Sequence, residues 1–233
     1  MIAQSRALLQ HLQWCGIETI PVAVDEELPV CPVVVDSASG RLQAGLDCRP
    51  ETLDEIAAEL QDCQRCALCK GRNALVFGVG NPQAQLVLVG EAPGREEDKQ
   101  GIPFVGEAGQ LLDRILHAMK LKREQVYICN VVKCRPPQNR DPQPEEIAAC
   151  EQFLQRQLAA IRPRLIVTLG RFATQTLLRS KAPIGQLRGH WHTYQGIPLM
   201  PTFHPAYLLR TPSGKREVWE DMKQVMHRLR EET

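Results

Sequence analysis

Cysteines are the residues of this chain with the clearest capacity for chemistry, and the 233-residue sequence contains nine of them. Two residues separate Cys63 from Cys66, while Cys134 and Cys150 flank a proline-rich segment. Two such pairs of thiolates suit a tetrahedral Zn²⁺ or a [4Fe–4S] cluster, because both are bound by soft sulfur ligands. The spacing alone leaves open whether Cys66 or Cys69 completes the first pair. We therefore expect a four-thiolate metal site.

Three polar segments follow apolar runs and form a second group of candidate functional residues. They are Gly90–Gly94 (GEAPG), Asn130–Arg140 and His204–Arg210 (HPAYLLR). In open parallel sheets, ligands bind in the crevice at the carboxyl ends of the strands. The three segments are thus expected to line one pocket.

Individual residues near these segments each allow two interpretations. Glu91 could serve as a general base or could favour a helix start through the helix dipole. Phe104 could stack on a planar ligand or anchor the core. The amide of Asn130 offers a donor and an acceptor side by side, which suits a nucleobase edge or a turn cap. His204 is weak evidence by itself, but it lies close to Leu208, Leu209 and Arg210 in a basic region.

The elements that must position these residues alternate regularly after residue 50. Short apolar runs predict strands over residues 85–90, 126–133, 165–170 and 197–203. Amphipathic stretches predict helices over residues 52–63, 111–119, 145–161, 172–179 and 218–230. Thr52 and Glu55 form a capping-box pattern at the first of these helices. Buried strands separated by helices indicate an α/β fold, a three-layer α/β/α domain around a central, mainly parallel four-stranded sheet.

The remaining part of the chain is expected to be organised differently. Residues 1–50 are predicted to form a short helix (Ser5–Trp14) followed by an irregular acidic arm or linker. Residues 51–233 are predicted to form the catalytic domain.

Composition and charge exclude several classes of protein. The chain is 43% hydrophobic with a net charge of +1, has no apolar run near the 20 or so residues that span a bilayer, and begins without a signal-peptide pattern. We therefore expect a cytoplasmic protein with no membrane association, in which clustered thiols bind metal rather than form disulfides. Residues 152–216 contain Lys and Arg but no Asp or Glu, a pattern typical of polyanion binders.

Taken together, the motifs resemble one family. The segments GEAPGREEDKQGIPFVGEAGQLLD, NVVKCRPPQNRDPQPEE and HPAYLLR, in this order, are similar to those of the family-four, iron–sulfur uracil-DNA glycosylases. The segment CQRCALCKGRNALVFGVGNP resembles the start of that family's domain. The resemblance covers about residues 60–230 and leaves the N-terminal arm outside.

The resemblance implies a monofunctional hydrolase for base excision repair, which flips uracil out of DNA, hydrolyses its N-glycosidic bond and leaves an abasic site. It places a [4Fe–4S] cluster on Cys63, Cys66, Cys134 and Cys150. It assigns catalysis to Glu91 and His204. It assigns uracil binding to Ala92, Pro93, Glu97, Phe104 and Asn130. It assigns the DNA wedge to Leu208, Leu209 and Arg210.

Roles follow from these assignments. Phe104 would stack on the flipped base, Asn130 would read its edge, and Glu97 would reject the methyl group of thymine. The loop between Cys134 and Cys150 would carry basic residues toward DNA phosphates, namely Lys133, Arg135 and Arg140.

The expected partner is uracil-containing DNA, single- or double-stranded, bound by a nucleoid-associated monomer. The N-terminal arm could dock a replication or repair protein. An alternative is a non-catalytic iron–sulfur module that binds DNA or accompanies a polymerase, and another is an electron-transfer protein. A relative that binds uracil covalently through a His-containing loop is disfavoured, because CRPPQNRDPQPEE contains no His.

Overall fold

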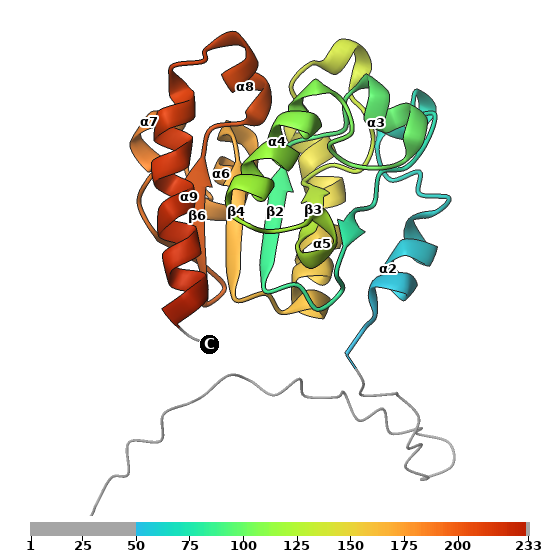
Figure 1. Cartoon of the computed structure of the whole chain (residues 1–233). Helices are drawn as coiled ribbons and strands as arrows, with labels where there is room; N and C mark the ends of the chain where they lie inside the picture. The colour runs from blue at the N-terminus through green and yellow to red at the C-terminus, as the bar shows by residue number, and fades with distance from the viewer. Residues whose placement is uncertain (1–49, 232–233) are drawn as a thin grey trace, which may run out of the picture. The chain divides into compact units, whose positions relative to one another are not determined.

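A central six-stranded sheet organises the computed structural model, which describes residues 50–231 (Figure 1). The strand order is β1-β3-β2-β4-β6-β5. The strands are β1 (Val79–Gly80), β2 (Leu86–Gly90), β3 (Tyr127–Asn130), β4 (Leu165–Leu169), β5 (His192–Tyr194) and β6 (Ile197–Thr202). The predicted helix Ser5–Trp14 and the acidic arm lie outside the described residues.

The four predicted strands are confirmed as β2, β3, β4 and β6, and they pair in parallel. The sheet is wider than predicted because β1 and β5 add antiparallel strands at its two edges. The parallel strands β2, β3 and β4 are buried along their whole length, as expected for a sheet with both faces covered.

Helices cover both faces and make the expected three layers. The α-helices are α2 (Leu53–Leu60), α3 (Arg95–Gln100), α4 (Glu107–Ala118), α5 (Pro144–Ile161), α6 (Arg171–Leu178), α7 (Ile184–Leu187), α8 (Pro205–Arg210) and α9 (Gly214–Glu231). Short 3₁₀ helices are η1 (Ala67–Lys70), η2 (Arg123–Gln125) and η3 (Pro137–Asn139). Apolar residues of α5 and α6 form one core with the sheet, and those of α4, α8 and α9 form a second core on the other face. Figure 1 shows α4 and α9 in front of the strands.

Helix α2 begins at the predicted cap. The Thr52 hydroxyl accepts from the Glu55 N–H, and the Glu55 carboxylate accepts from the Thr52 N–H. Its buried Ile56 and Leu60 pack with Phe153 of α5 in a separate small core. Helix α2 is thereby held on α5.

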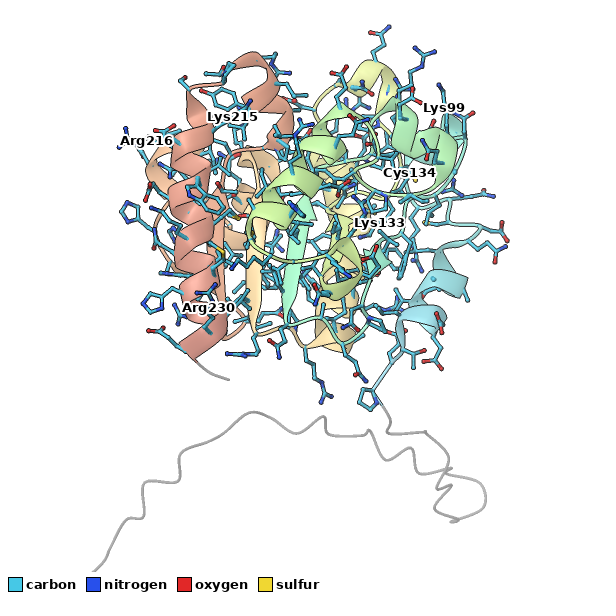
Figure 2. All side chains as sticks on the ribbon, in the orientation of Figure 1. Lys99, Lys133, Cys134, Lys215, Arg216 and Arg230 are labelled. Atoms are coloured by element: carbon cyan, nitrogen blue, oxygen red, sulfur yellow. The ribbon has the colours of Figure 1, made fainter. Side chains whose placement is uncertain are left out.

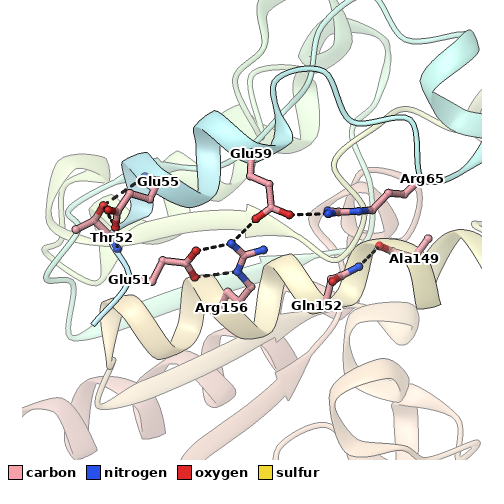
Figure 3. A network of polar contacts seen from close by, with 8 residues as sticks. All are labelled: Glu51, Thr52, Glu55, Glu59, Arg65, Ala149, Gln152 and Arg156. Atoms are coloured by element: carbon pink, nitrogen blue, oxygen red, sulfur yellow. Dashed lines mark hydrogen bonds and ion pairs between the residues drawn. The ribbon is translucent and has the colours of Figure 1, made fainter. Parts of the chain in front are cut away.

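Polar contacts reinforce this α2–α5 contact (Figure 3). The Arg156 guanidinium on α5 pairs with Glu51 and with Glu59 of α2. Glu59 also pairs with Arg65, 2.6 Å away, and both arginines together hold the pKa of Glu59 at about 2. Since Cys63 lies three residues after the end of α2 and Cys150 lies on α5, this contact brings the two ends of the cysteine motif toward each other.

Two polar segments contain short helices that are not among those predicted from the sequence. The polar stretch Arg95–Gln100 forms α3, which ends at Gly101 with a left-handed φ of 72°. The segment after His204 forms α8, with Pro205 in its first turn, where the missing N–H costs no helical hydrogen bond. Within residues 50–231, no helix combines the length and the apolar character needed to cross a bilayer.

Candidate active site and cysteine cavity

A cavity of about 390 Å³ lies at the carboxyl ends of the parallel strands. Its lining includes Glu91, Ala92, Pro93, Glu97, Phe104, Asn130, His204 and Arg210. The expectation that three strand-end segments share one pocket is thus confirmed, since the cavity draws on each of them. Asn139 and Tyr207 also line it; both belong to the predicted polar segments, but the sequence alone does not single out either residue.

Asn130, the last residue of β3, is the deepest polar residue of this cavity, with 1% of its surface exposed. It lies beside Gly90 of β2 in the parallel register. Its Oδ1 is the only buried side-chain nitrogen or oxygen among residues 50–231 without a hydrogen-bond partner. A Cβ on Gly90 would come within 2.3 Å of that oxygen and 2.6 Å of Phe104 Cζ. Glycine at position 90 therefore leaves room for an amide acceptor beneath an aromatic ring.

Phe104 is held in an unusual backbone conformation. Its φ is 54°, in the left-handed region that side chains rarely adopt. The Arg123 guanidinium donates to the Phe104 carbonyl at 2.9 Å, and Gly109 of α4 approaches the same carbonyl so closely that a Cβ there would clash. The ring lies 5.6 Å from the His204 ring, centroid to centroid. These contacts fix Phe104 where it can cover a planar ligand.

Glu97, on α3, holds the turn that carries Phe104. Its Oε1 accepts from the main-chain N–H groups of Val105 and Gly106, both at 2.9 Å. A Cβ on Gly94 would lie 2.7 Å from Glu97 Oε2, so this carboxylate also fills space beside the strand end. Glu97 therefore stabilises the turn that forms this wall of the pocket.

Glu91 is the carboxylate suited to proton transfer. It follows β2 directly, and its carbonyl accepts from the Val132 N–H at 3.1 Å. Burial, together with the negative charge of Asp141, raises the pKa of Glu91 to about 7, while Arg171 opposes this shift. A general base acts best when its pKa is near the working pH.

His204 caps α8 through its ring, since Nδ1 accepts from the Ala206 N–H at 3.1 Å. Burial and the nearby Arg210 lower the pKa of His204 to about 4, against a smaller opposing effect of Glu97. The ring is therefore neutral near pH 7, and with Nδ1 as acceptor its proton resides on Nε2. Gly170, with φ of 90°, packs behind it, where a Cβ would lie 2.8 Å from His204 Cβ.

The residues assigned to the DNA wedge separate in the structure. Leu208 is 1% exposed and packs in the core between α4 and α9. Leu209 is 40% exposed, and Tyr207 beside it is 37% exposed. Arg210 is exposed at the cavity edge. Of the two leucines, Leu209 is therefore the one available to enter a base stack.

A second, smaller cavity gathers the cysteines. It is lined by Cys63, Cys66, Cys69, Cys134 and Cys150, together with Arg72 and Lys133. The Arg72 guanidinium donates to Cys134 Sγ at 3.4 Å, and the Lys133 N–H donates to Cys150 Sγ at 3.3 Å. Hydrogen bonds to sulfur are typical of thiolates that bind iron.

The cysteine cavity offers thiol ligands, which suit an iron–sulfur cluster or a zinc ion. No group of three or more His, Cys, Asp or Glu side chains within the described residues is arranged to hold one metal ion. A cluster offers a separate iron to each thiolate, so its ligands can stand farther apart. Burial raises the pKa of Cys66 and Cys134, and that of Cys150 to about 11. Metal binding would have to deprotonate these thiols, and would release their protons.

The three basic residues expected to contact DNA phosphates, namely Lys133, Arg135 and Arg140, do not all face solvent. Lys133, expected to contact DNA phosphates, is fully buried, so that prediction is wrong. Its amine donates instead to the Asn130 carbonyl at 2.7 Å. Arg140 lines the cavity at the strand ends and pairs with Glu146 through two bonds of 2.8 and 2.6 Å. Arg135 donates to Asn139 Oδ1 at 2.7 Å.

Comparisons with known proteins agree with this geometry. Residues 77–223 match the model of the uracil DNA glycosylase superfamily. A type-4 uracil-DNA glycosylase of Archaeoglobus fulgidus is 45% identical over 75% of this chain and 92% of its own length. Type-4 enzymes of Saccharolobus solfataricus and Thermotoga maritima are each 44% identical, over 77% and 79% of this chain and 87% and 98% of their own lengths. The chain therefore belongs to the uracil-DNA glycosylase superfamily and, within it, to the type-4 uracil-DNA glycosylases.

Proposed function

We propose that this protein is a DNA repair enzyme that removes uracil from DNA by hydrolysing its N-glycosidic bond. One observation carries the proposal: the unpartnered Oδ1 of Asn130, buried at the end of β3 beside the Phe104 ring. A buried acceptor without a partner is costly, so it is expected to be matched by a ligand donor. Uracil, whose N3 carries a proton, supplies that donor.

Base discrimination follows from the same amide. Uracil N3–H would donate to Asn130 Oδ1, and the amide nitrogen would donate to uracil O4. Cytosine presents an unprotonated N3 and an amino group at these positions, so both contacts would be mismatched. A site built around hydrogen bonds rejects an analogue that leaves its buried polar groups unpaired. Phe104 would stack on the ring, and Glu97 would limit the space near C5.

Access to the base requires flipping, because the glycosidic bond of a stacked nucleotide is out of reach. Leu209 would enter the vacated stack, and Arg210 would face the strand beside it, as apolar wedges do in other minor-groove proteins. Several arginines of the segment from residue 152 to residue 216 pair with carboxylates, among them Arg171 with Asp141 and Arg188 with Asp221. The exposed Arg210 at the cavity edge supports contact with the phosphate backbone.

Bond cleavage would leave negative charge on the departing uracil. The Nε2–H of neutral His204 would donate to uracil O2 and stabilise that charge. Glu91, with its pKa near 7, would orient and deprotonate the attacking water. With only water as nucleophile, the reaction ends at an abasic site, so the enzyme is monofunctional.

The cysteine cavity supports a [4Fe–4S] cluster on Cys63, Cys66, Cys134 and Cys150. When bound, such a cluster would link the segment after α2, the loop after β3 and helix α5.

We place the enzyme in the cytoplasm, on the nucleoid, as a monomer acting on DNA. We also place a domain boundary near residue 50 and assign a partner-binding role to the N-terminal arm.

The test is excision from a labelled oligonucleotide with a single uracil, followed by alkaline cleavage at abasic sites. Wild type should cut only at uracil, and Asn130→Ala should lose activity while still binding DNA. Asn130→Asp, which offers acceptors to an amino group, should gain activity on cytosine relative to uracil. Iron-loaded, DNA-binding wild type that releases no uracil would contradict the enzyme assignment and favour a non-catalytic DNA-binding module.

A further inference from the structure

We propose that Lys133 is a positioning residue for uracil excision, joining the cysteine cavity to the uracil pocket. Its amine holds the main-chain carbonyl of Asn130, and its main-chain N–H holds Cys150 Sγ. The proposal rests on the proposed function, because it assigns to Lys133 the task of orienting the base-reading amide.

The burial of Lys133 needs an explanation. It has 0% of its surface exposed and is among the largest of the fully buried side chains in the described part of the chain. Lysine is almost never fully buried unless it is paired with an opposite charge. In Figure 2, Lys133 and Cys134 are labelled within the body of the domain, whereas Lys99 is labelled at its edge. Burial at such a cost indicates a role that an apolar side chain could not fill.

The amine of Lys133 reaches the strand end that reads the base. It donates to the Asn130 carbonyl at 2.7 Å and to Gln157 Oε1 at 2.5 Å. The Gln157 amide nitrogen in turn donates to the Phe77 carbonyl and the Tyr127 hydroxyl, at 3.1 and 3.2 Å. This hydrogen-bond network holds the amine in a fixed position. A fixed carbonyl holds the peptide plane after Asn130, and with it the main-chain position from which the base-reading amide projects.

The main chain of Lys133 is anchored at the cysteine cavity. Its N–H donates to Cys150 Sγ at 3.3 Å, and its carbonyl accepts from the Val76 N–H at 2.9 Å. One residue earlier, the Val132 N–H donates to the Glu91 carbonyl at 3.1 Å. The turn from residue 130 to residue 134 therefore connects the base reader, the general base and two cysteines.

The main chain of Lys133 links it to the cysteine cavity. Lys133 is among the residues that line this cavity, and its N–H donates to Cys150 Sγ. A shift of this turn in Lys133→Met should therefore displace Cys150 and the Asn130 amide together, which would loosen the iron that the cysteines would bind.

The activity profile separates positioning from a merely structural role. Lys133→Met leaves two buried acceptors, the Asn130 carbonyl and Gln157 Oε1, without their donor, which costs stability. Lys133→Met should therefore lower the melting temperature, but the protein that remains folded should still bind DNA. A residue kept only for folding would reduce all activities in proportion to the loss of folded protein, whereas loss of a positioning residue lowers the excision rate and the uracil preference more than it lowers DNA binding.

The experiment uses the full-length, iron-loaded protein and compares Lys133→Met with Lys99→Met, which removes an exposed amine paired with Glu96. Four quantities are measured: the single-turnover excision rate, the Kd for uracil-containing duplex, the ratio of uracil to cytosine cleavage, and the rate of iron loss to a chelator. We expect Lys133→Met to slow excision about 10²-fold, as misplacement of a reactive group by about 1 Å can do. Its Kd should stay within about twofold of wild type, its uracil preference should fall, and its iron loss should accelerate. Lys99→Met should match wild type throughout.

Either of two results would overturn the proposal. One is a Lys133→Met protein with the wild-type excision rate and uracil preference. The other is a rate that falls only in step with melting temperature and iron content. If Lys133→Met does not fold, Gln157→Met tests the same hydrogen-bond network. It should give a smaller loss of excision rate and of uracil preference. Wild type that fails to release uracil would instead refute the proposed function, and the iron-loss comparison would still test the link of Lys133 to the cysteine cavity.

Discussion

The pKa of Glu91 gives the sharpest prediction, because it determines how excision depends on pH. With a pKa of about 7, roughly a tenth of Glu91 is ionised at pH 6 and roughly a hundredth at pH 5. The single-turnover rate should therefore fall about tenfold per pH unit below 7. His204, with a pKa of about 4, stays neutral over this range and should add a second fall only near pH 4.

The fall in rate below pH 7 forms the acidic limb of the pH profile. Variants of the charged neighbours of Glu91 should shift this acidic limb in opposite directions. Asp141→Asn removes the negative charge that raises the Glu91 pKa, so the limb should shift to lower pH. Arg171→Gln removes the opposing positive charge, so the limb should shift to higher pH. Both side chains are exposed, so each shift should be small and should shrink as salt is added.

Glu91→Gln supplies the decisive variant. It should slow excision by about 10²- to 10⁴-fold, as loss of a general base does, and should abolish the acidic limb. The fold favours the protonated form of Glu91, so this carboxyl group stabilises the protein below its ordinary pKa and loses that effect as pH rises through 7. Glu91→Gln should consequently raise the melting temperature at pH 8 but not at pH 4. A wild-type pH profile that is flat between 5 and 7, or is unchanged in Glu91→Gln, would refute the assignment of Glu91 as base.

Three further outcomes are expected. Gly90→Ala places a Cβ 2.3 Å from Asn130 Oδ1, so single-turnover excision should fall at least about 10²-fold while duplex binding, measured by fluorescence anisotropy, persists; normal excision would contradict the pocket geometry. Leu209→Ala should slow excision about tenfold from duplex but hardly from single-stranded DNA, where no stack is vacated; equal losses would argue against a wedge. Removing iron with a chelator should lower the melting temperature, because metal binding contributes to folding, and an unchanged transition in calorimetry would oppose a structural cluster.

Most of the sheet could be predicted from the sequence, because long buried strands leave a continuous apolar run. Leu86–Gly90 and Leu165–Leu169 are buried at every position. The edge strands leave no such run, since Val79–Gly80 is only two residues long and His192–Tyr194 is partly exposed. Helix α3 escapes sequence-based prediction for a related reason: its six residues are all polar and lack an amphipathic period.

The pocket residues were accessible to prediction because strand ends in a parallel sheet converge at one edge. Side-chain burial was less accessible, because it depends on packing between distant segments. Lys133 has the sequence context of a surface residue in a basic loop, yet Gln157 of α5 completes its interior site. Leu208 and Leu209 are identical in type, and only the position of α8 against α4 and α9 distinguishes them.

The unmatched oxygen of Asn130 also affects the release of the product. Uracil freed from the sugar keeps its N3 proton, so the leaving base satisfies this acceptor as well as the nucleotide did. The site is preformed, with Phe104 held in place by Arg123 and Gly109, and no wall needs to relax after cleavage. Departure of the base must break the same contacts that recognise it, so we expect release of uracil to be slow compared with a site that recognises its base less closely.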